Sequence, residues 1–507
     1  MKAHIPSFVL VASLACLAAL PEGVSGQRTP ASLTLDVALA EALTNNPTLL
    51  STRNQEALAR ADIRNSRGDL LPSATVSSSV SWQGQGEQRF GSVTLGQLGV
   101  QDQQSFYFSS YQLGLGFELD GSRILAPGRA QMAWDARQAR VREGEDRVRL
   151  EVTRAYLEVL RQVEEVRLAQ SETDRAQQNW RLVEAQRDVG LATDLEASQA
   201  QVGLGRSEVN QVRASAALHQ ATATLLALMG WDPTIPVELT TRFQLFPVAA
   251  AEDALLEMAM SGNPSLAAGR LEEDVASREV TMARTAYLPS VSVQASWSGF
   301  TRRAGSTQLL IDQANAQSQQ QVEQCQWQNE IYSRLANPIP AQNCSLLRLS
   351  PDQQRGLAAS NEAFPFDFTR QPPQALLSLS LPIFQGFTRS RRVEGARLEL
   401  DNARLRIRDE ELQLRRDITS GVTWARAAYQ TASLEERNRN VAEQQLNLAR
   451  EQFRVGAVDF LQLLEAEAVK ARADREWLAA VFAFHDTLAS LEAVVGAPIR
   501  SILGETP

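Results

Sequence analysis

The chain is poor in the side chains that most often perform catalysis or bind metals. Its 507 residues include three histidines (His4, His219 and His485) and three cysteines, and lysine occurs only at Lys2 and Lys470. A nucleophile–base pair or a cluster of metal ligands would draw on these residue types, and the sequence brings none of them together. We therefore expect no enzymatic activity, no cofactor and no metal ion.

Long apolar runs and an excess of positive charge are absent as well. After residue 26, no uninterrupted apolar run approaches the roughly 18 residues that a transmembrane helix needs, so none is expected. The net charge of −9 argues against a protein that binds nucleic acid. With 44% hydrophobic and 21% charged residues, the composition is that of a folded chain.

Residues 1–26 have the form of a secretory signal peptide. A short basic start precedes an apolar stretch over residues 8–20, and small residues at 24–26 precede a predicted cut ahead of Gln27. Lipoprotein processing at Cys16 is the alternative. A secreted chain can carry disulfides, so Cys325 and Cys344 form the one pair available after the cut.

Proline is missing from two long segments, residues 128–232 and 383–497, which are rich in helix-forming residues. Apolar residues in the first segment recur at heptad spacing, as in helices packed side by side: Val152, Tyr156, Val159, Val163 and Val166. Gly190 and Gly456 interrupt the two segments and would end a helix in each. Each segment is therefore predicted to be a helical hairpin whose long arm reaches about 100 Å.

The mature chain is a duplication. Residues 38–47 resemble 255–264, residues 71–73 resemble 288–290, and residues 188–190 resemble 454–456, in the same order. The first repeat is predicted at 27–245, with a helix, strands at about 74–82 and 106–119, and a hairpin at about 123–230. The second is predicted at 246–507, with a helix, strands at about 290–299 and 374–384, and a hairpin at about 388–496.

The predicted strands alternate between apolar and small polar residues. Val76, Val80 and Trp82 share one face, whereas the intervening positions are serines, and Trp297 closes a similar pattern in the second repeat. This alternation is typical of a membrane β-barrel with a wet lumen, and the two tryptophans would belong to an interfacial girdle. A soluble sandwich is the alternative. Four strands are too few to close a barrel, so a membrane-spanning sheet would have to be shared between copies.

Together these features resemble the outer membrane efflux proteins, the TolC-like ducts of Gram-negative bacteria. The resemblance rests on LTLDVALAEALTNNP at 33–47, ARADIRNSRGDLLPS at 59–73, REVTMARTAYLPS at 278–290 and FRVGAVDFLQLLEAE at 453–467. It implies a mainly α-helical chain with β-strands. Three copies would form a 12-stranded barrel in outer-membrane lipid, a 12-helix periplasmic tunnel, and a mixed belt that includes the segment near 231–250. It also implies partners, namely a periplasmic adaptor protein and an inner-membrane transporter.

The resemblance places the functional residues at the two hairpin tips, farthest from the barrel. Residues expected to contact the adaptor are Gly190, Thr193, Asp194, Leu195, Phe453, Gly456, Leu464 and Ala466. Residues at positions that select cations in some relatives are Gln462 and Glu465, with Asp459 contributing. The alternative is that Glu465 is a solvated helix residue and that Asp459 only caps a helix, as Thr193 or Asp194 would in the first repeat.

The second repeat has extra residues in its loop, at about 300–372, which the barrel prediction places outside the cell. This loop contains a glutamine-rich stretch and both remaining cysteines, and its low complexity indicates partial disorder. A disulfide between Cys325 and Cys344 would fix its middle. The expected function is a passive exit duct for efflux or secretion. The alternative is a periplasmic coiled-coil structural or adaptor protein.

Overall fold

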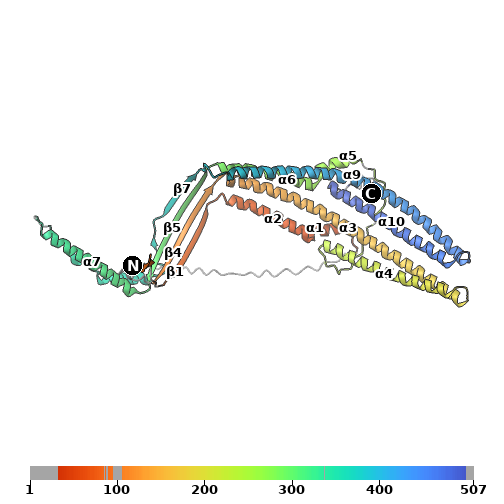
Figure 1. Cartoon of the computed structure of the whole chain (residues 1–507), viewed down its shortest axis with the longest axis horizontal. Coiled ribbons are helices and arrows are strands. Elements are labelled where there is room, and N and C mark those ends of the chain that lie inside the picture. Colours follow the sequence, from red (N-terminus) through yellow and green to blue (C-terminus); the bar gives the residue numbers. More distant parts are fainter. Residues whose placement is uncertain are drawn as a thin grey trace. The chain divides into compact units, whose positions relative to one another are not determined.

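The computed structural model describes residues 32–84, 86, 89–94, 105–241, 243–249, 251–335, 337, 339–497 and 499. The predicted signal peptide and Cys16 lie outside these residues. The chain forms two compact units, shown in Figure 1. Among the described residues, the helical unit lies within 1–56, 138–268 and 407–507, and the sheet unit lies within 57–137 and 269–406.

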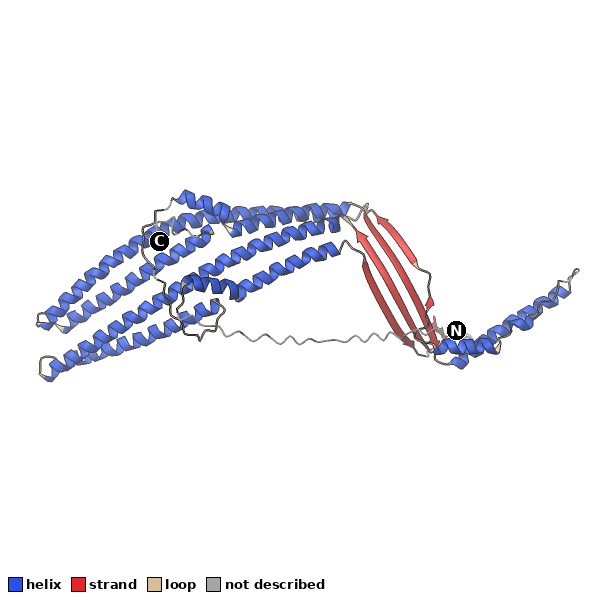
Figure 2. Cartoon of the chain, turned by 180° about the vertical axis from the view of Figure 1, so that it is seen from behind, coloured by secondary structure: helices blue, strands red, loops and turns tan. Residues whose placement is uncertain are grey.

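The sheet unit is built on four long antiparallel strands (Figure 2). They are β1 (Ser73–Gln83), β4 (Phe106–Leu119), β5 (Ser290–Ala304) and β7 (Gln374–Ser380), paired in the order β1-β4-β5-β7. The short β6 (Thr369–Arg370) extends the pairing on β5, and β2 (Arg89–Phe90) forms a separate small hairpin with β3 (Val93–Thr94).

The strand register separates one apolar face from one polar face. Val76 lies opposite Leu113, which lies opposite Trp297, and all three share the apolar face. The next positions, Ser77, Gln112 and Ser298, are also aligned and form part of the polar face. Val76 is 78% exposed, so within this chain the apolar face of β1 is uncovered. The predicted alternation of strands is confirmed.

Two strand ends differ from the prediction. β5 continues to Ala304 instead of ending near 299, so Trp297 lies in the middle of the strand rather than at its end. Trp82 does lie near the end of β1, opposite Tyr107. β7 ends at Ser380 rather than near 384, because Ser380 lies opposite Ser290, where its partner strand β5 begins.

The long insertion after β5 is ordered, and the prediction of partial disorder is wrong for its described residues. It contains α7 (Thr307–Ser333), the 3₁₀ turn η3 (Cys344–Leu347) and α8 (Pro351–Glu362). Cys325 and Cys344 form a disulfide that joins α7 to η3. The buried Asn361 side chain accepts a hydrogen bond from the Ala304 N–H (2.7 Å) and donates to Thr307 Oγ1 (2.9 Å), which fixes α8 to the end of β5.

The helical unit contains most of the two predicted hairpins. α3 (Gly121–Asp188) is followed by α4 (Asp194–Leu228), and α9 (Thr388–Arg454) is followed by α10 (Phe460–Val495). α10 is long and apolar enough, by length and composition alone, to cross a membrane. The core helix of a bundle passes the same test, and α10 buries Phe484, Leu488 and Leu491 in such a core.

Each repeat begins with two helices where the sequence predicted one. The first pair is α1 (Leu35–Asn45) and α2 (Pro47–Gly68), and the second is α5 (Glu252–Gly262) and α6 (Pro264–Arg284), followed by the 3₁₀ turn η2 (Thr285–Tyr287). Asn46 accepts from the Leu49 N–H and donates to the Leu228 carbonyl. Asn263 repeats this pattern with Leu266 and Val494. One asparagine thus caps a helix start and satisfies the end of another helix.

Two apolar cores lie beside these breaks. One buries Tyr156, Leu225 and Met229 from the first hairpin, and the other buries Ile418 and Phe484 from the second. The inter-repeat segment runs from the first core to the second: Trp231, Ile235, Val237, Leu239 and Phe243 pack against one, and Leu245, Phe246 and Val248 pack against the other. This is the segment that the sequence analysis assigns to a mixed belt; Arg242 and Ala250 lie outside the described residues.

Candidate functional site

The two hairpin tips have the same backbone geometry. Gly190 and Gly456 take left-handed conformations, with φ of +78° and +74°. In the first tip, the Leu191 N–H donates to the Gln186 carbonyl (2.8 Å) and the Gly190 N–H donates to the Arg187 carbonyl (2.9 Å). This is the Schellman pattern that closes a helix end, and the second tip repeats it at Gly456 and Ala457. Both turns are therefore compact and fixed by backbone bonds.

The helices that follow the tips begin with side-chain caps. Thr193, not Asp194, caps α4, and its Oγ1 accepts from the Glu196 N–H while the Glu196 carboxylate accepts from the Thr193 N–H at 2.7 Å. Asp459 caps α10, because its Oδ1 accepts from the Gln462 N–H at 2.9 Å. These caps satisfy donors that a helix start otherwise leaves unpaired.

A third apolar cluster lies next to the tips and combines residues of both hairpins. Its buried members are Val183, Ala197, Ala200, Leu446, Phe460, Leu463 and Ala466. Phe453 and Leu464 are half-buried against it, and the rings of Phe453 and Phe460 lie 5.8 Å apart. Ala466 is only 3% exposed, so the expectation that it contacts an adaptor does not fit its position. It instead allows helices to pack closely.

Large apolar side chains surround both turns and are left uncovered by the described part of the chain. They are Val189, Leu191 and Leu195 at the first tip and Val455 and Leu461 at the second, with exposed fractions of 64% or more. Of these, only Leu195 was singled out from the sequence. The other four could have been selected from the sequence as the apolar residues closest to Gly190 and Gly456. Residues next to a tight turn have few neighbours in their own chain to pack against, so apolar side chains there are expected to be exposed.

Asp459, Gln462 and Glu465 lie on one face at the start of α10, since they are spaced by three residues. All three are exposed within this chain. Glu467, two residues further, is instead engaged inside the unit: Asn179 Nδ2 donates to both of its oxygens at 2.8 Å, and Arg450 lies 3.7 Å away. The face with Glu465 is thus free of this internal network.

A charge cluster with a buried lysine–aspartate pair at its centre, which sequence analysis missed, joins α9 to α10 near the second tip. We define it as Arg439, Glu443, Lys470 and Asp474. The Lys470 ammonium pairs with Asp474 and lies 3.0 Å from Glu443, and Arg439 Nε donates to Asp474 at 2.8 Å. The side chains of Lys470 and Asp474 are each 6% exposed. The spacing of four residues could have indicated an ion pair between Lys470 and Asp474, but nothing in the sequence indicated that this pair is buried.

A cavity of about 450 Å³ lies between α3, α10 and α1. Asp146, Arg149 and Glu492 are among the residues that line it. Burial raises the pKa of the Asp146 carboxyl above its usual range, with a smaller contribution from neighbouring Glu145, while Arg149 acts in the opposite direction. This is a titratable group that the sequence gave no reason to select.

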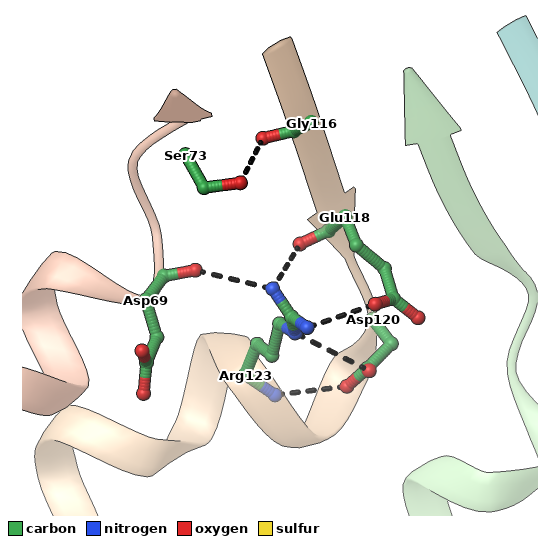
Figure 3. A network of polar contacts seen from close by, with 6 residues as sticks. All are labelled: Asp69, Ser73, Gly116, Glu118, Asp120 and Arg123. Atoms are coloured by element: carbon green, nitrogen blue, oxygen red, sulfur yellow. Dashed lines mark hydrogen bonds and ion pairs between the residues drawn. The ribbon is translucent and has the colours of Figure 1, made fainter. Parts of the chain in front are cut away.

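Arg123 organises the junction where β4 leads into α3 (Figure 3). Its guanidinium donates to the Glu118 carboxylate (2.8 Å) and carbonyl (3.2 Å), and to the Asp69 carbonyl after α2 (3.5 Å). Its own backbone N–H donates to Asp120 Oδ1, which caps α3. One side chain therefore links the end of a strand, the start of a long helix and the turn before β1.

Comparison with known proteins identifies this architecture. A sequence model of the family described as "Outer membrane efflux protein" matches residues 38–231 and 353–497, which is more than half of the chain. The chain belongs to the outer membrane efflux protein family. Membership in this family places the protein in the outer membrane, and its fold is that of the TolC-like channels. The insertion at about 300–372 lies mostly in the unmatched gap between these two ranges.

Two curated relatives of this efflux protein align over part of their length. It is 26% identical over 254 residues to outer membrane protein TolC of Vibrio cholerae, covering 50% of this chain and 55% of the relative. It is 29% identical over 191 residues to the pyoverdine export outer membrane protein OpmQ of Pseudomonas aeruginosa, covering 34% and 40%. The chain thus spans about half the length of these relatives.

Solved channels match this efflux protein over nearly its whole length at low sequence identity. The Campylobacter jejuni CmeC outer membrane channel has a TM-score of 0.66 and 14% identity, covering 94% of this chain and 90% of that one. The Neisseria gonorrhoeae MtrE outer membrane channel, in its open state, has a TM-score of 0.63 and 18% identity, covering 92% and 89%. These likenesses establish the fold.

Proposed function

We propose that this protein is the outer-membrane exit duct of a tripartite efflux or type I secretion system and conducts its cargo passively. The observation that carries the proposal is the sheet. It presents one polar face and one apolar face, and its outer strands β1 and β7 each pair, among the described residues, with a single long strand. A sheet with free edges leaves backbone groups unpaired in lipid at several kcal/mol each.

Closure of the sheet by further copies would pair its free edges and would keep its polar face away from lipid. Three copies would supply twelve strands, pair β1 of one copy with β7 of the next, and turn the polar face toward a water-filled lumen. The apolar face would then meet lipid, with Trp82 near one interface. Phe384 and Phe387, which the sequence analysis did not select, would lie near the other interface, after β7, where they are 76% and 83% exposed.

The hairpin tips supply the proposed contact with a periplasmic adaptor, which in turn would hold an inner-membrane transporter. The turns at Gly190 and Gly456 are closed by backbone hydrogen bonds, and exposed Leu191 lies in the first turn. Leu195 and Leu461 are exposed in the first turns of α4 and α10. Such exposed apolar side chains on a fixed backbone are typical of sites that bind a protein partner. Thr193, Asp194 and Phe453 would support this surface, and Ala466 would act only through packing.

Glu465, with Gln462 and Asp459 beside it, would form a ring of negative charge at the closed end of the tunnel. Three-fold repetition of one exposed carboxylate in a narrow pore favours cations. In planar bilayers, Glu465→Gln should weaken block by multivalent cations added from the tip side. Unchanged block would show that Glu465 is an ordinary solvated helix residue.

The duct proposal is tested by fractionation, oligomeric state and conductance together. The protein should be recovered from the outer membrane as a trimer, and the purified trimer should open single channels in planar bilayers. Recovery in the soluble periplasm, without conductance, would instead favour the alternative, a coiled-coil structural or adaptor protein. Leu191→Asn and Leu461→Asn should abolish export in cells while leaving conductance unchanged, because they remove exposed apolar side chains from the adaptor contact and add no charge near the proposed ring.

A further inference from the structure

An aromatic and cationic cluster occupies the polar face of the sheet at its loop end. We call it the exit cluster and define it as Phe106, Phe108, Phe300 and Arg302. The rings of Phe108 and Phe300 are stacked, with centroids 5.8 Å apart and planes 17° apart. The Arg302 guanidinium carbon lies 3.3 Å from the centroid of the Phe106 ring. Both contacts join β4 to β5.

The register places these four residues on the polar face. Phe108 lies opposite Arg302, and Phe300 lies opposite Ser110. Along β4 and β5, the polar face otherwise consists of small or polar side chains, namely Ser110, Gln112, Gly114, Gly116, Glu118, Ser292, Gln294, Ser296 and Ser298. Three phenylalanines are therefore an exception to the pattern of this face, and all three lie at the loop end of the paired strands.

Packing among the described residues does not account for these rings. Phe108 and Phe300 remain 39% and 37% exposed. On the opposite face, Phe368 packs edge-on against Tyr111 at 4.9 Å, whereas Tyr107 and Trp82 are 38% and 65% exposed. Exposed aromatic rings on the apolar face can meet lipid, whereas Phe108 and Phe300 lie on the face that would line water.

We propose that the exit cluster binds planar aromatic anions as they leave the channel. This inference rests on the proposed function, in which the polar face lines the lumen of a shared barrel. A barrel of twelve strands spaced about 4.8 Å apart and tilted by about 40° is roughly 24 Å wide at the backbone. Large rings projecting from its wall narrow the lumen and offer π-faces to passing cargo, while Arg302 supplies positive charge.

The cluster lies at the extracellular mouth, because β4 begins and β5 ends beside the long loops, whereas the other ends of these strands continue into α3 and α6. Repetition by the barrel's symmetry would place three sets of rings around one opening. Flat aromatic anions would stack on phenylalanine and pair with arginine, whereas aliphatic anions of similar size would gain only the charge interaction.

The test measures binding and channel block on the purified trimer with two probes, 1-naphthalenesulfonate and hexanesulfonate. We expect the wild type to bind the naphthalene compound more tightly and to show stronger current block by it when both compartments contain the probe. Phe108→Ala combined with Phe300→Ala should raise the dissociation constant for naphthalenesulfonate about tenfold. Arg302→Gln should weaken the binding of both probes about threefold.

Leu115→Ala is the matched control, because Leu115 lies on β4, is 38% exposed and belongs to the apolar face. It should leave the binding of both probes unchanged. Equal binding of the two probes, or unchanged binding in the double phenylalanine variant, would overturn the inference. Binding that depends on Phe108 and Phe300 in a trimer that conducts no current would support the cluster and refute the duct. A trimer that conducts current but whose probe binding does not depend on Phe108 and Phe300 would support the duct and refute the exit cluster.

Discussion

Removal of Asp474 should destabilise the second hairpin locally. The size of this effect follows from the ion pairs of the charge cluster. Loss of one partner from a buried ion pair costs about 3–5 kcal/mol when the remaining charge has no other partner. Lys470 keeps Glu443, 3.0 Å away, but that carboxylate is 52% exposed and is a weaker partner than a buried one. We therefore expect Asp474→Ala to cost about 2 kcal/mol, which is about a 30-fold increase in local opening.

Hydrogen exchange of the detergent-solubilised trimer measures this opening directly. Peptides from α10 around Lys470 should exchange about 30-fold faster in Asp474→Ala, whereas peptides from α4 should be unchanged. The double variant Lys470→Met with Asp474→Leu should exchange nearly as slowly as wild type, because apolar residues of similar size replace both charges. Exchange in the double variant as fast as in Asp474→Ala would refute the reasoning, since it would show that the loss is one of contacts and not of charge pairing.

Three further predictions concern the tips, the helical unit and the insertion. Gly456→Ala should lower the free energy of local opening at the second tip, measured by hydrogen exchange, by about 1 kcal/mol, because φ is +74° at this position. Gly203→Ala is the contrasting variant: Gly203 lies inside α4 with open space around it, so alanine there should stabilise the helix by about the same amount. Because burial raises the Asp146 pKa, the native state holds that proton more tightly than the unfolded state, so the contribution of Asp146 to stability falls as pH rises from about 4. Asp146→Asn should remove this contribution from a melting-temperature profile, and an unchanged profile would exclude the effect. Cys325→Ser should destabilise the insertion by about 3 kcal/mol and make α7 sensitive to proteolysis, while leaving conductance unaltered. Resistance of α7 to protease equal to that of the wild type would contradict this prediction.

Much of the fold could be predicted because its signals are local. Proline-free segments, the glycines at 190 and 456 and the capping residues Thr193 and Asp459 set the hairpins to within a few residues. Alternation of apolar and small polar residues set the two faces of the sheet, because side chains of a strand point to opposite sides in turn. The polar insertion was misjudged as partly disordered, although Ser350 and Gln353 form a capping box that the sequence already contains.

The remaining features depend on contacts across the chain. The end of β5 was placed too early because Arg302 and Arg303 interrupt the strand pattern, yet both find aromatic partners on β4, at Phe106 and Tyr107. The burial of Lys470 depends on α9, and that of Ala466 depends on the neighbouring hairpin. No local pattern distinguishes these positions from exposed ones on the same helix.

The burial of Lys470 also determines how this protein reacts with amine-directed reagents. Lys2 belongs to the predicted signal peptide, so the mature chain would contain one lysine side chain, and that amine is paired and 6% exposed. Reagents that modify lysine would find almost no target on the native surface beyond the amino terminus. A lysine introduced at either tip would then be a single reactive handle on an otherwise inert chain, which would allow a bound partner to be cross-linked and mapped one position at a time.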